Sequence, residues 1–146
     1  MRKYIIIATL VLSGLTGKGQ NQNSLRDSLY HHDNGEKIYI KEVDNLPVYP
    51  KGDTALFAFI IKNIVYPIDA KEKEIQGTVY SSFVVEKNGD ITDLKIIKGL
   101  NESCNKEVLR LLKLLSNGWT PAINHGQPVR YQYILPIKFT MKGKTK

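Results

Sequence analysis

Three groups of side chains in this chain of 146 residues have the chemical types that could hold a metal or attack a substrate. The first is His31-His32-Asp33, because imidazole and carboxylate groups are common metal ligands. The three residues are adjacent in a polar stretch, and the sequence has no second cluster at ligand spacing. We therefore interpret them as surface residues and predict no metal site.

The second group is Cys104 with His125, which would be a nucleophile and its base only if folding brought them together. Cys104 falls on the apolar stripe of an expected helix, whereas His125 falls in a turn-rich segment that we expect to be exposed. As the one cysteine of the chain, Cys104 cannot form an internal disulfide. The pattern favours a small buried hydrophobe. A reactive thiol, and with it a small secreted hydrolase, stays as the alternative.

The third group is Asp90 with Asp93, which flank an expected hairpin, where acids commonly serve turns and solubility. The sequence has neither a glycine-rich phosphate loop before a helix nor a Gly-x-Ser-x-Gly elbow. We therefore predict that the chain is not an enzyme, and that it has no catalytic residue and no cofactor.

Composition and charge favour one ordinary globular domain. Hydrophobic residues make up 42% of the chain and charged residues 24%, which are both typical values. The formal net charge is +7, but Arg2, Lys3 and Lys18 stand at the start and the other charges are spread along the chain. Because nucleic-acid binding would require a basic stripe with interleaved aromatic residues, we predict no nucleic-acid partner.

Residues 1–19 have the pattern of a secretory signal peptide. A positive start and an apolar run lead to small residues before Gln20, where we expect the cut. The apolar run ends by Leu15 and is shorter than the about 20 residues of a membrane span. We expect a cleaved signal and a periplasmic protein. The alternative is that residues 4–15 stay as an inner-membrane anchor.

The rest of the chain is expected to divide into a linker, a folded domain and a tail. The linker is polar, and a short strand is expected at Lys37–Lys41, where apolar and polar residues partly alternate. The predicted boundaries are 1–19 for the signal peptide, 20–48 for the linker, 49–142 for the domain and 143–146 for a basic tail.

Two helices are expected at the start of the folded domain. Apolar residues recur at helical spacing after Asp53, which we expect to be the N-cap. This helix ends before Tyr66-Pro67, because the residue before a proline avoids the α region. Pro67 suits the first turn of a second, short helix from Ile68 to Glu74.

A hairpin and a third helix are expected next. The strands are residues 77–86 and Ile91–Lys98, joined at Asn88-Gly89, which is the strongest short hairpin signal. Asn101 is expected to cap the helix, and Asn117-Gly118 to end it. The helix has an apolar stripe and an opposite face that we expect to meet water. The stripe carries Cys104, Val108, Leu111, Leu112 and Leu115, and the wet face carries Lys106, Glu107, Arg110 and Lys113.

The last strand is expected at Val129–Met141, where apolar side chains recur with a period of two. This period predicts one buried face and one largely wet face. Pro136 lies inside the strand, and because proline cannot donate to a central ladder, we predict an edge strand. The fold class that follows is α+β, with a three-stranded antiparallel sheet and helices packed on one face.

The ordered set of motifs resembles the TonB C-terminal domain family, over the stretch from about Tyr49 to Met141. The set begins with the expected turn before the second helix and ends with the long alternating strand. Its members are Tyr66-Pro67, Ile75 to Val79, Asn88-Gly89, Trp119 to Pro121 and His125 to Val129.

The resemblance implies a periplasmic domain that binds the TonB box, an extended segment of an outer-membrane receptor, in energy-coupled transport. The segment adds as a strand beside the last strand of the domain, near the Tyr-Pro turn, and backbone hydrogen bonds supply much of the affinity. Gly77, Gly89 and Trp119 also match family positions, and we interpret them as structural. The partner-binding residues that the resemblance implies are Asn63, Tyr66, Pro67, Arg130, Gln132 and Ile134.

The chain departs from the family pattern in two places: the segment that would transmit force, and the turn before Trp119. A full energy transducer has an uncleaved membrane helix and a proline-rich spacer, whereas this linker has no proline before Pro47. The turn before Trp119 commonly carries proline in the family, and here it is Ser116 to Gly118, which is expected to loosen that corner. The alternative is an exported envelope module, or a homodimer, that uses the same edge strand without energy transduction. Pro136 could also simply blunt that edge against pairing.

Overall fold

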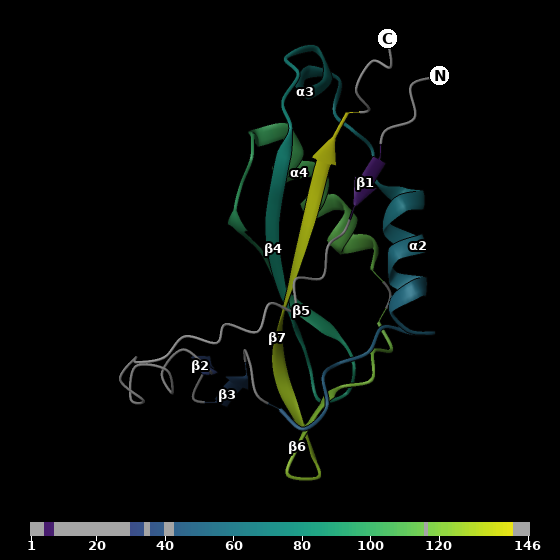
Figure 1. The fold of residues 1–146 in the computed structure, drawn as a ribbon. Helices are drawn as coiled ribbons and strands as arrows, with labels where there is room; N and C mark the ends of the chain where they lie inside the picture. The colour runs from purple at the N-terminus through teal and green to yellow at the C-terminus, as the bar shows by residue number, and fades with distance from the viewer. Residues whose placement is uncertain (1–4, 8–29, 34–35, 40–42, 116, 142–146) are drawn as a thin grey trace, which may run out of the picture.

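The computed structural model describes residues 5–7, 30–33, 36–39, 43–115 and 117–141 (Figure 1). Three helices lie in these residues: α2 (Asp53–Asn63), α3 (Ile68–Glu72) and α4 (Glu102–Leu114). The strands are β1 (Ile5–Ile7), β2 (Tyr30–Asp33), β3 (Glu36–Tyr39), β4 (Gly77–Val85), β5 (Ile91–Lys98), β6 (Ala122–Asn124) and β7 (Gln127–Thr140).

The three strands expected from the sequence form the centre of the sheet, with β4 between β5 and β7 and both pairs antiparallel. The described sheet has the order β2-β3-β7-β4-β5, and β1 and β6 also pair with β7. The prediction of three strands is therefore correct for the centre and wrong for the whole sheet. The added strands have three or four residues each, which is too short for a clear period of two.

Strand β7 is not a simple edge strand, and this part of the prediction is wrong. On the side away from β4, β3 pairs in parallel with Arg130 and Tyr131, and β1 pairs antiparallel with residues 138–140. Strand β6 pairs with residues 127–129. Pro136 excludes a ladder bond from its own nitrogen, but it does not exclude partners a few residues away. No strand in the described part of the chain pairs with residues 132–137 on this side.

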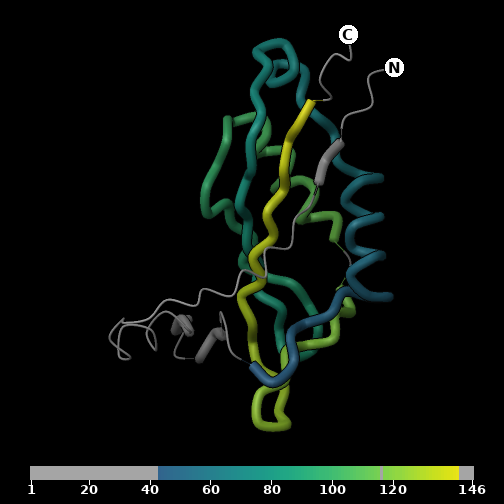
Figure 2. Tube along the Cα trace, in the orientation of Figure 1, coloured from purple at the N-terminus to yellow at the C-terminus, as the bar shows by residue number. Residues whose placement is uncertain are grey.

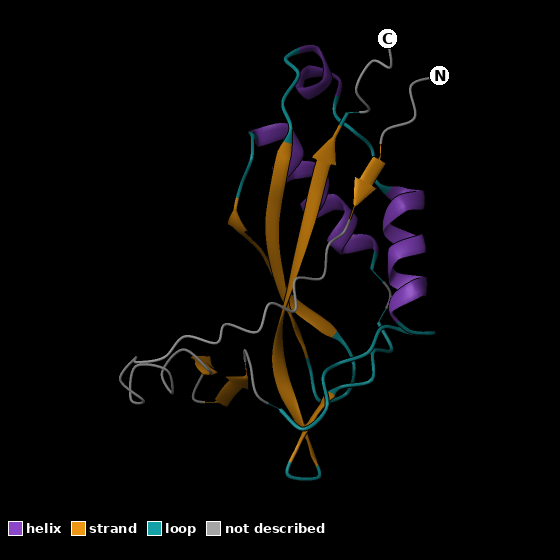
Figure 3. Ribbon diagram, in the orientation of Figure 1, coloured by secondary structure: helices purple, strands orange, loops and turns teal. Residues whose placement is uncertain are grey.

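Helices α2 and α4 pack against one face of the sheet (Figure 3), as the α+β prediction requires. The core between these helices and the sheet is mostly apolar, and Ser81 is a buried polar residue of β4 on the same face as Val79. It contains Leu56 and Ile60 from α2, Val108, Leu111 and Leu112 from α4, and Val79, Phe83, Tyr133, Leu135, Ile137 and Phe139 from the sheet. Burial of these apolar side chains stabilises the fold by about 25 cal/mol per Å² of apolar area, and it is the main contribution that holds the helices on the sheet.

The second face of the sheet is less wet than the alternation predicted. Ile134 and Lys138 are exposed, but Pro136 is buried, and so are Ser82 and Val84 on the neighbouring strand β4. The reason is the position of β4 between two strands. Val84, for example, lies in register with Thr92 of β5 and with Gln132 of β7, so neighbouring side chains cover it from both sides.

The helix caps follow the sequence in one case and depart from it in another. Asn101 caps α4, and its side-chain oxygen accepts from the Cys104 N–H at 3.0 Å, as expected. Asp53 is not the N-cap of α2. That position belongs to Gly52 with φ 89°, and Asp53 is the first helical residue. There its negative charge still interacts favourably with the positive end of the helix dipole. The second helix ends at Glu72, two residues earlier than expected.

Most of the predicted export signal and part of the linker lie outside the described residues. Of the signal, only Ile5–Ile7 is described, as β1. The segment 43–48, placed in the linker from its sequence, joins the domain by two isolated bridges. Asn45 exchanges backbone hydrogen bonds with Ile123, and Val48 with Thr120, at 2.9–3.0 Å. Figure 2 shows the segment 43–48 side by side with the segment 120–123.

The corner before Trp119 is tied down rather than loosened, although Ser116 itself is outside the described residues. The N–H groups of Gly118 and Trp119 both donate to the carbonyl oxygen of Gly89, at 3.1 and 3.0 Å. The Asn117 side-chain oxygen accepts from the Ile91 N–H at 3.3 Å. The corner is therefore held by the β4–β5 hairpin turn, which takes the place of a local proline.

Candidate partner-binding site

The outer edge of β7, defined as the backbone of residues 132–137 on the side away from β4, is the first part of the candidate site. Pro136 is in register with Tyr80 of β4 but has no N–H to give to that strand. In an antiparallel ladder alternate residues face the same neighbour, so Gln132 and Ile134 direct their backbone groups to the same side as Pro136. The Ser81 hydroxyl donates to the Leu135 carbonyl at 2.8 Å, which agrees with odd-numbered residues facing β4. The outer edge therefore offers N–H groups at Gln132 and Ile134.

Arg130, at one end of this edge, is held by a carboxylate of the adjacent hairpin. Its Nε donates to Glu86 Oε2 at 2.7 Å and its Nη2 to Oε1 at 3.1 Å. Burial by itself raises the pKa of Glu86, but hydrogen bonds from Arg130 and from the Thr92 hydroxyl outweigh it and hold that pKa below its usual value. A partner that took up Arg130 would have to compete with Glu86.

Replacing Glu86 with glutamine should make the free energy of unfolding of the domain depend less on pH in the acid range. A carboxyl whose folded pKa is lowered stabilises the fold above its unfolded pKa, and this contribution is lost as the pH falls through the folded pKa. We expect Glu86→Gln to cost about 1 kcal/mol near pH 7 and close to nothing near pH 2. Urea unfolding at both pH values measures this, and an equal loss at both would contradict the ionic role.

Gln132 and Ile134 lie further along the same face of β7. The Gln132 amide donates to Ser82 Oγ at 3.2 Å and is half-buried. Ile134 has 44% of its surface exposed, although it stands in the middle of a strand. An exposed isoleucine beside open backbone groups is a suitable surface for an apolar side chain of an added strand.

The Tyr66–Pro67 turn, defined as residues 63–67, is the second part of the candidate site. Tyr66 is buried with 3% of its surface exposed, and its hydroxyl donates to the Ile75 carbonyl. Its ring meets Phe139 of β7 edge-on, with centroids 5.3 Å apart. The Asn63 side-chain nitrogen donates to the Phe59 carbonyl at 2.7 Å. Pro67 is half-buried and precedes α3 as its N-cap.

The structure brings the six sequence-predicted residues together as two groups rather than one. Arg130, Gln132 and Ile134 share one face of β7, whereas Tyr66 packs on Phe139, which points to the helix-covered face. Phe139 is five residues further along the strand than Ile134, a distance of about 17 Å. The Tyr66–Pro67 turn therefore lies beyond the far end of the outer edge, next to the stretch that β1 occupies.

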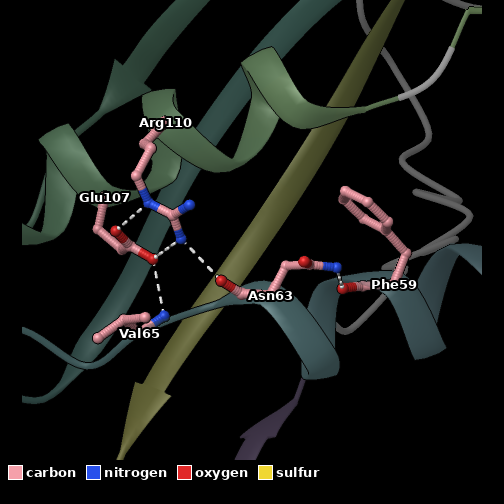
Figure 4. Close-up of polar contacts among 5 residues, drawn as sticks. All are labelled: Phe59, Asn63, Val65, Glu107 and Arg110. Carbon is pink, nitrogen blue, oxygen red and sulfur yellow. Dashed lines mark hydrogen bonds and ion pairs between the residues drawn. The ribbon is translucent and has the colours of Figure 1, made fainter.

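Sequence reasoning missed two residues that hold this turn, Glu107 and Arg110 (Figure 4). Both were placed on the wet face of α4, but the Glu107 side chain is only 11% exposed. Glu107 Oε1 accepts from the Val65 N–H at 2.7 Å, and Arg110 Nη2 donates to the Asn63 carbonyl at 2.7 Å. The one signal in the sequence was the Glu-Arg spacing of three, which is common on exposed helices.

Cys104, His125 and Asp93 lie in three different settings within the described part of the chain. Cys104 is fully buried in α4, where burial, followed by Asp69 and Glu107, raises the pKa of its thiol to about 11. His125 lies in the exposed β6–β7 turn, where its N–H donates to Asp44 Oδ2 at 2.6 Å. Asp93 pairs with Lys95 at 2.7 Å. Among the described residues no group of His, Cys, Asp and Glu could hold a metal ion.

The architecture defines a small α+β domain in which helices cover one face of an antiparallel sheet. The sequence model of the family described as "Gram-negative bacterial TonB protein C-terminal" matches residues 62–141, which is more than half of the chain. The chain therefore belongs to the TonB C-terminal domain family. Among solved structures, the NMR solution structure of the Helicobacter pylori TonB C-terminal domain is similar, with 23% sequence identity and a TM-score of 0.44. The similarity covers 62% of this chain and 95% of that one. No curated protein matches.

Membership of the family supports a TonB-like role in energy-coupled transport. Domains of this family are transport and interaction domains, they are periplasmic in Gram-negative bacteria, and their partners are in general outer-membrane receptors. Of the helices that the structure describes, none is long and apolar enough to cross a membrane.

Proposed function

We propose that this chain is a periplasmic TonB-like domain that binds the TonB box of an outer-membrane TonB-dependent receptor by adding it as a strand to the outer edge of β7. The observation that carries the proposal is the outer edge of β7, where residues 132–137 have no described strand on the side away from β4. Strand addition satisfies such groups with main-chain hydrogen bonds from the added strand.

The stretches on either side of the open segment support the proposal. Strand β3 pairs with residues 130–131 and β1 with residues 138–140, so this edge accepts strands at both ends. Cleavage before Gln20 would remove β1 and extend the open edge to Thr140. The added strand would then run from Ile134 and Gln132 toward the Tyr66–Pro67 turn, with Arg130 at its other end.

Replacing Gln132 with proline should weaken binding of a synthetic TonB-box peptide to the chain that starts at Gln20 by about tenfold or more. Proline removes the outward N–H of residue 132 and places its ring in the path of the added strand. The ladder to β4 is unaffected, because the residue 132 N–H does not face that strand. Titration followed by backbone amide shifts gives the dissociation constant, and the expected shifts fall on β7 and the Tyr66–Pro67 turn.

Gln132→Ala is the matched control, because it removes the same side chain and keeps the N–H. It should bind as the unsubstituted chain does. Equal weakening by alanine and proline would mean that the side chain makes the contact. An unchanged dissociation constant for Gln132→Pro, or no amide shifts at millimolar peptide, would contradict strand addition at this edge.

A further inference from the structure

The backbone that leads into the Tyr66–Pro67 turn depends on α4 for its hydrogen bonds. Helix α2 ends at Asn63, and the Ile64 N–H still donates to the Ile60 carbonyl. The last carbonyls of the helix have no partner within it, and the Val65 N–H is the first beyond this last helical bond. Two of these groups are taken by α4: the Asn63 carbonyl by Arg110 at 2.7 Å, and the Val65 N–H by Glu107 at 2.7 Å. The turn is therefore held from a helix more than forty residues away in sequence.

The two α4 residues also hold each other, so the four groups form one network (Figure 4). Arg110 Nε donates to Glu107 Oε2 at 2.8 Å and its Nη2 to Oε1 at 2.6 Å. This two-pronged geometry fixes both side chains. The Arg110 charge also lies at the C-terminal end of α2, where the helix dipole favours a cation. We call Glu107 and Arg110, with their bonds to Asn63 and Val65, the α4 clamp.

The clamp reaches β7 through one residue. Tyr66 follows Val65 directly, and its buried ring packs edge-on against Phe139. Phe139 is next to Lys138, whose backbone lies on the same side of β7 as that of Gln132 and Ile134. A displacement of Val65 would therefore move the Tyr66 ring and with it the far end of the outer edge.

We infer that Glu107 and Arg110 are positioning residues for partner binding, because they fix the Tyr66–Pro67 turn against the end of the β7 edge before a partner arrives. This inference rests on the proposed function. A site that is ordered beforehand binds more tightly than one that is competent for only part of the time, by the inverse of that fraction. The clamp residues act through the turn and need not touch the partner.

The test compares Glu107→Ala with Glu102→Gln, an exposed residue of the same helix. Glu102 forms an ion pair with Lys106, and the two side chains are 82% and 73% exposed, so this pair has no part in the turn. We expect Glu107→Ala to bind the TonB-box peptide about threefold to tenfold more weakly, at a temperature where all variants are folded. Glu102→Gln should leave the dissociation constant unchanged.

A purely structural role is separated by two further measurements. Hydrogen exchange of the Val65 amide should accelerate in Glu107→Ala and stay unchanged in Glu102→Gln. Glu107→Gln keeps a side-chain oxygen for the Val65 N–H and loses only the charge, so it should recover part of the affinity. It also serves in place of Glu107→Ala if that variant does not fold.

The possible outcomes distinguish this inference from the function on which it rests. If the unsubstituted chain does not bind the peptide, the proposed function is wrong and the inference falls with it. If the unsubstituted chain binds the peptide, and Glu107→Ala and Glu107→Gln both bind it as tightly as the unsubstituted chain does, only the positioning role is overturned. Equal weakening by Glu102→Gln would overturn it too, since the effect would then come from charge alone.

Discussion

Replacement of Trp119 by alanine is expected to lower the free energy of unfolding by about 3–5 kcal/mol. The indole is buried, with 3% of its surface exposed, and it joins three rings from separate parts of the chain. Its centroid lies 5.3 Å from Tyr49, 5.3 Å from Phe83 and 5.2 Å from Tyr133, and all three contacts are edge-on. Alanine leaves a cavity among rings that the sheet backbone holds in place, so little of it can close.

The loss is measured by urea unfolding followed by far-UV circular dichroism, because the variant lacks the one tryptophan of the chain and with it the usual fluorescence signal. The midpoint of thermal unfolding should fall by roughly 15–30 °C for a domain of this size. Trp119→Phe keeps one ring in the site and should lose less than half as much. A loss below about 1 kcal/mol for the alanine variant would mean that Trp119 does not close the core.

Elements whose signals are local could be predicted from the sequence. Asn88-Gly89 forms the hairpin turn and Asn101 caps α4, because each depends on backbone geometry within a few residues. The α4 stripe is buried for the same reason, since Cys104 and Val108 follow the helical period. Asp53 was misplaced by one residue because Gly52, with its φ of 89°, can take the N-cap without a side chain.

Pro136 shows how much one residue can say about a strand. Because proline has no N–H, Pro136 gives no ladder bond to Tyr80, its register partner in β4. It carries no information on what covers the same side at residues 130–131 or 138–140, because those partners come from distant parts of the chain. The open segment between them is therefore a property of the fold, and the alternation in β7 alone could not delimit it.

For Glu107, the helical pattern predicts an exposed side chain, and this prediction is wrong. Its place opposite the apolar stripe predicts a solvated carboxylate, but the end of α2 passes over this part of α4 and supplies the Val65 N–H. Whether a polar side chain faces water or another backbone is decided by packing between helices. Asn63 and Tyr66, which the sequence predicts to bind a partner, also donate to backbone carbonyls of the domain, those of Phe59 and Ile75.

Gly89→Ala is expected to lower the free energy of unfolding by about 3–4 kcal/mol, which is more than the replacement of a turn glycine usually costs. Its φ is +87°, and a Cβ built there would lie 2.2 Å from the carbonyl oxygen of Trp119. Two causes therefore add: an L residue in the left-handed region costs about 1–2 kcal/mol, and the backbone that carries Trp119 must move. That movement would stretch the bonds from Gly118 and Trp119 to the Gly89 carbonyl, which are 3.1 and 3.0 Å long.

Gly126→Ala separates the two causes, because Gly126 also has a positive φ, +76°, but has nothing within 4 Å of the added Cβ. It should lose only the conformational part, about 1–2 kcal/mol. Urea unfolding of both variants gives the comparison, and the Trp119 fluorescence should change in Gly89→Ala alone. Equal losses would show that the corner moves aside freely. A larger loss for Gly89→Ala would show that the hairpin turn and the tryptophan corner are one rigid unit, through which the Asn-Gly turn positions the largest side chain of the core.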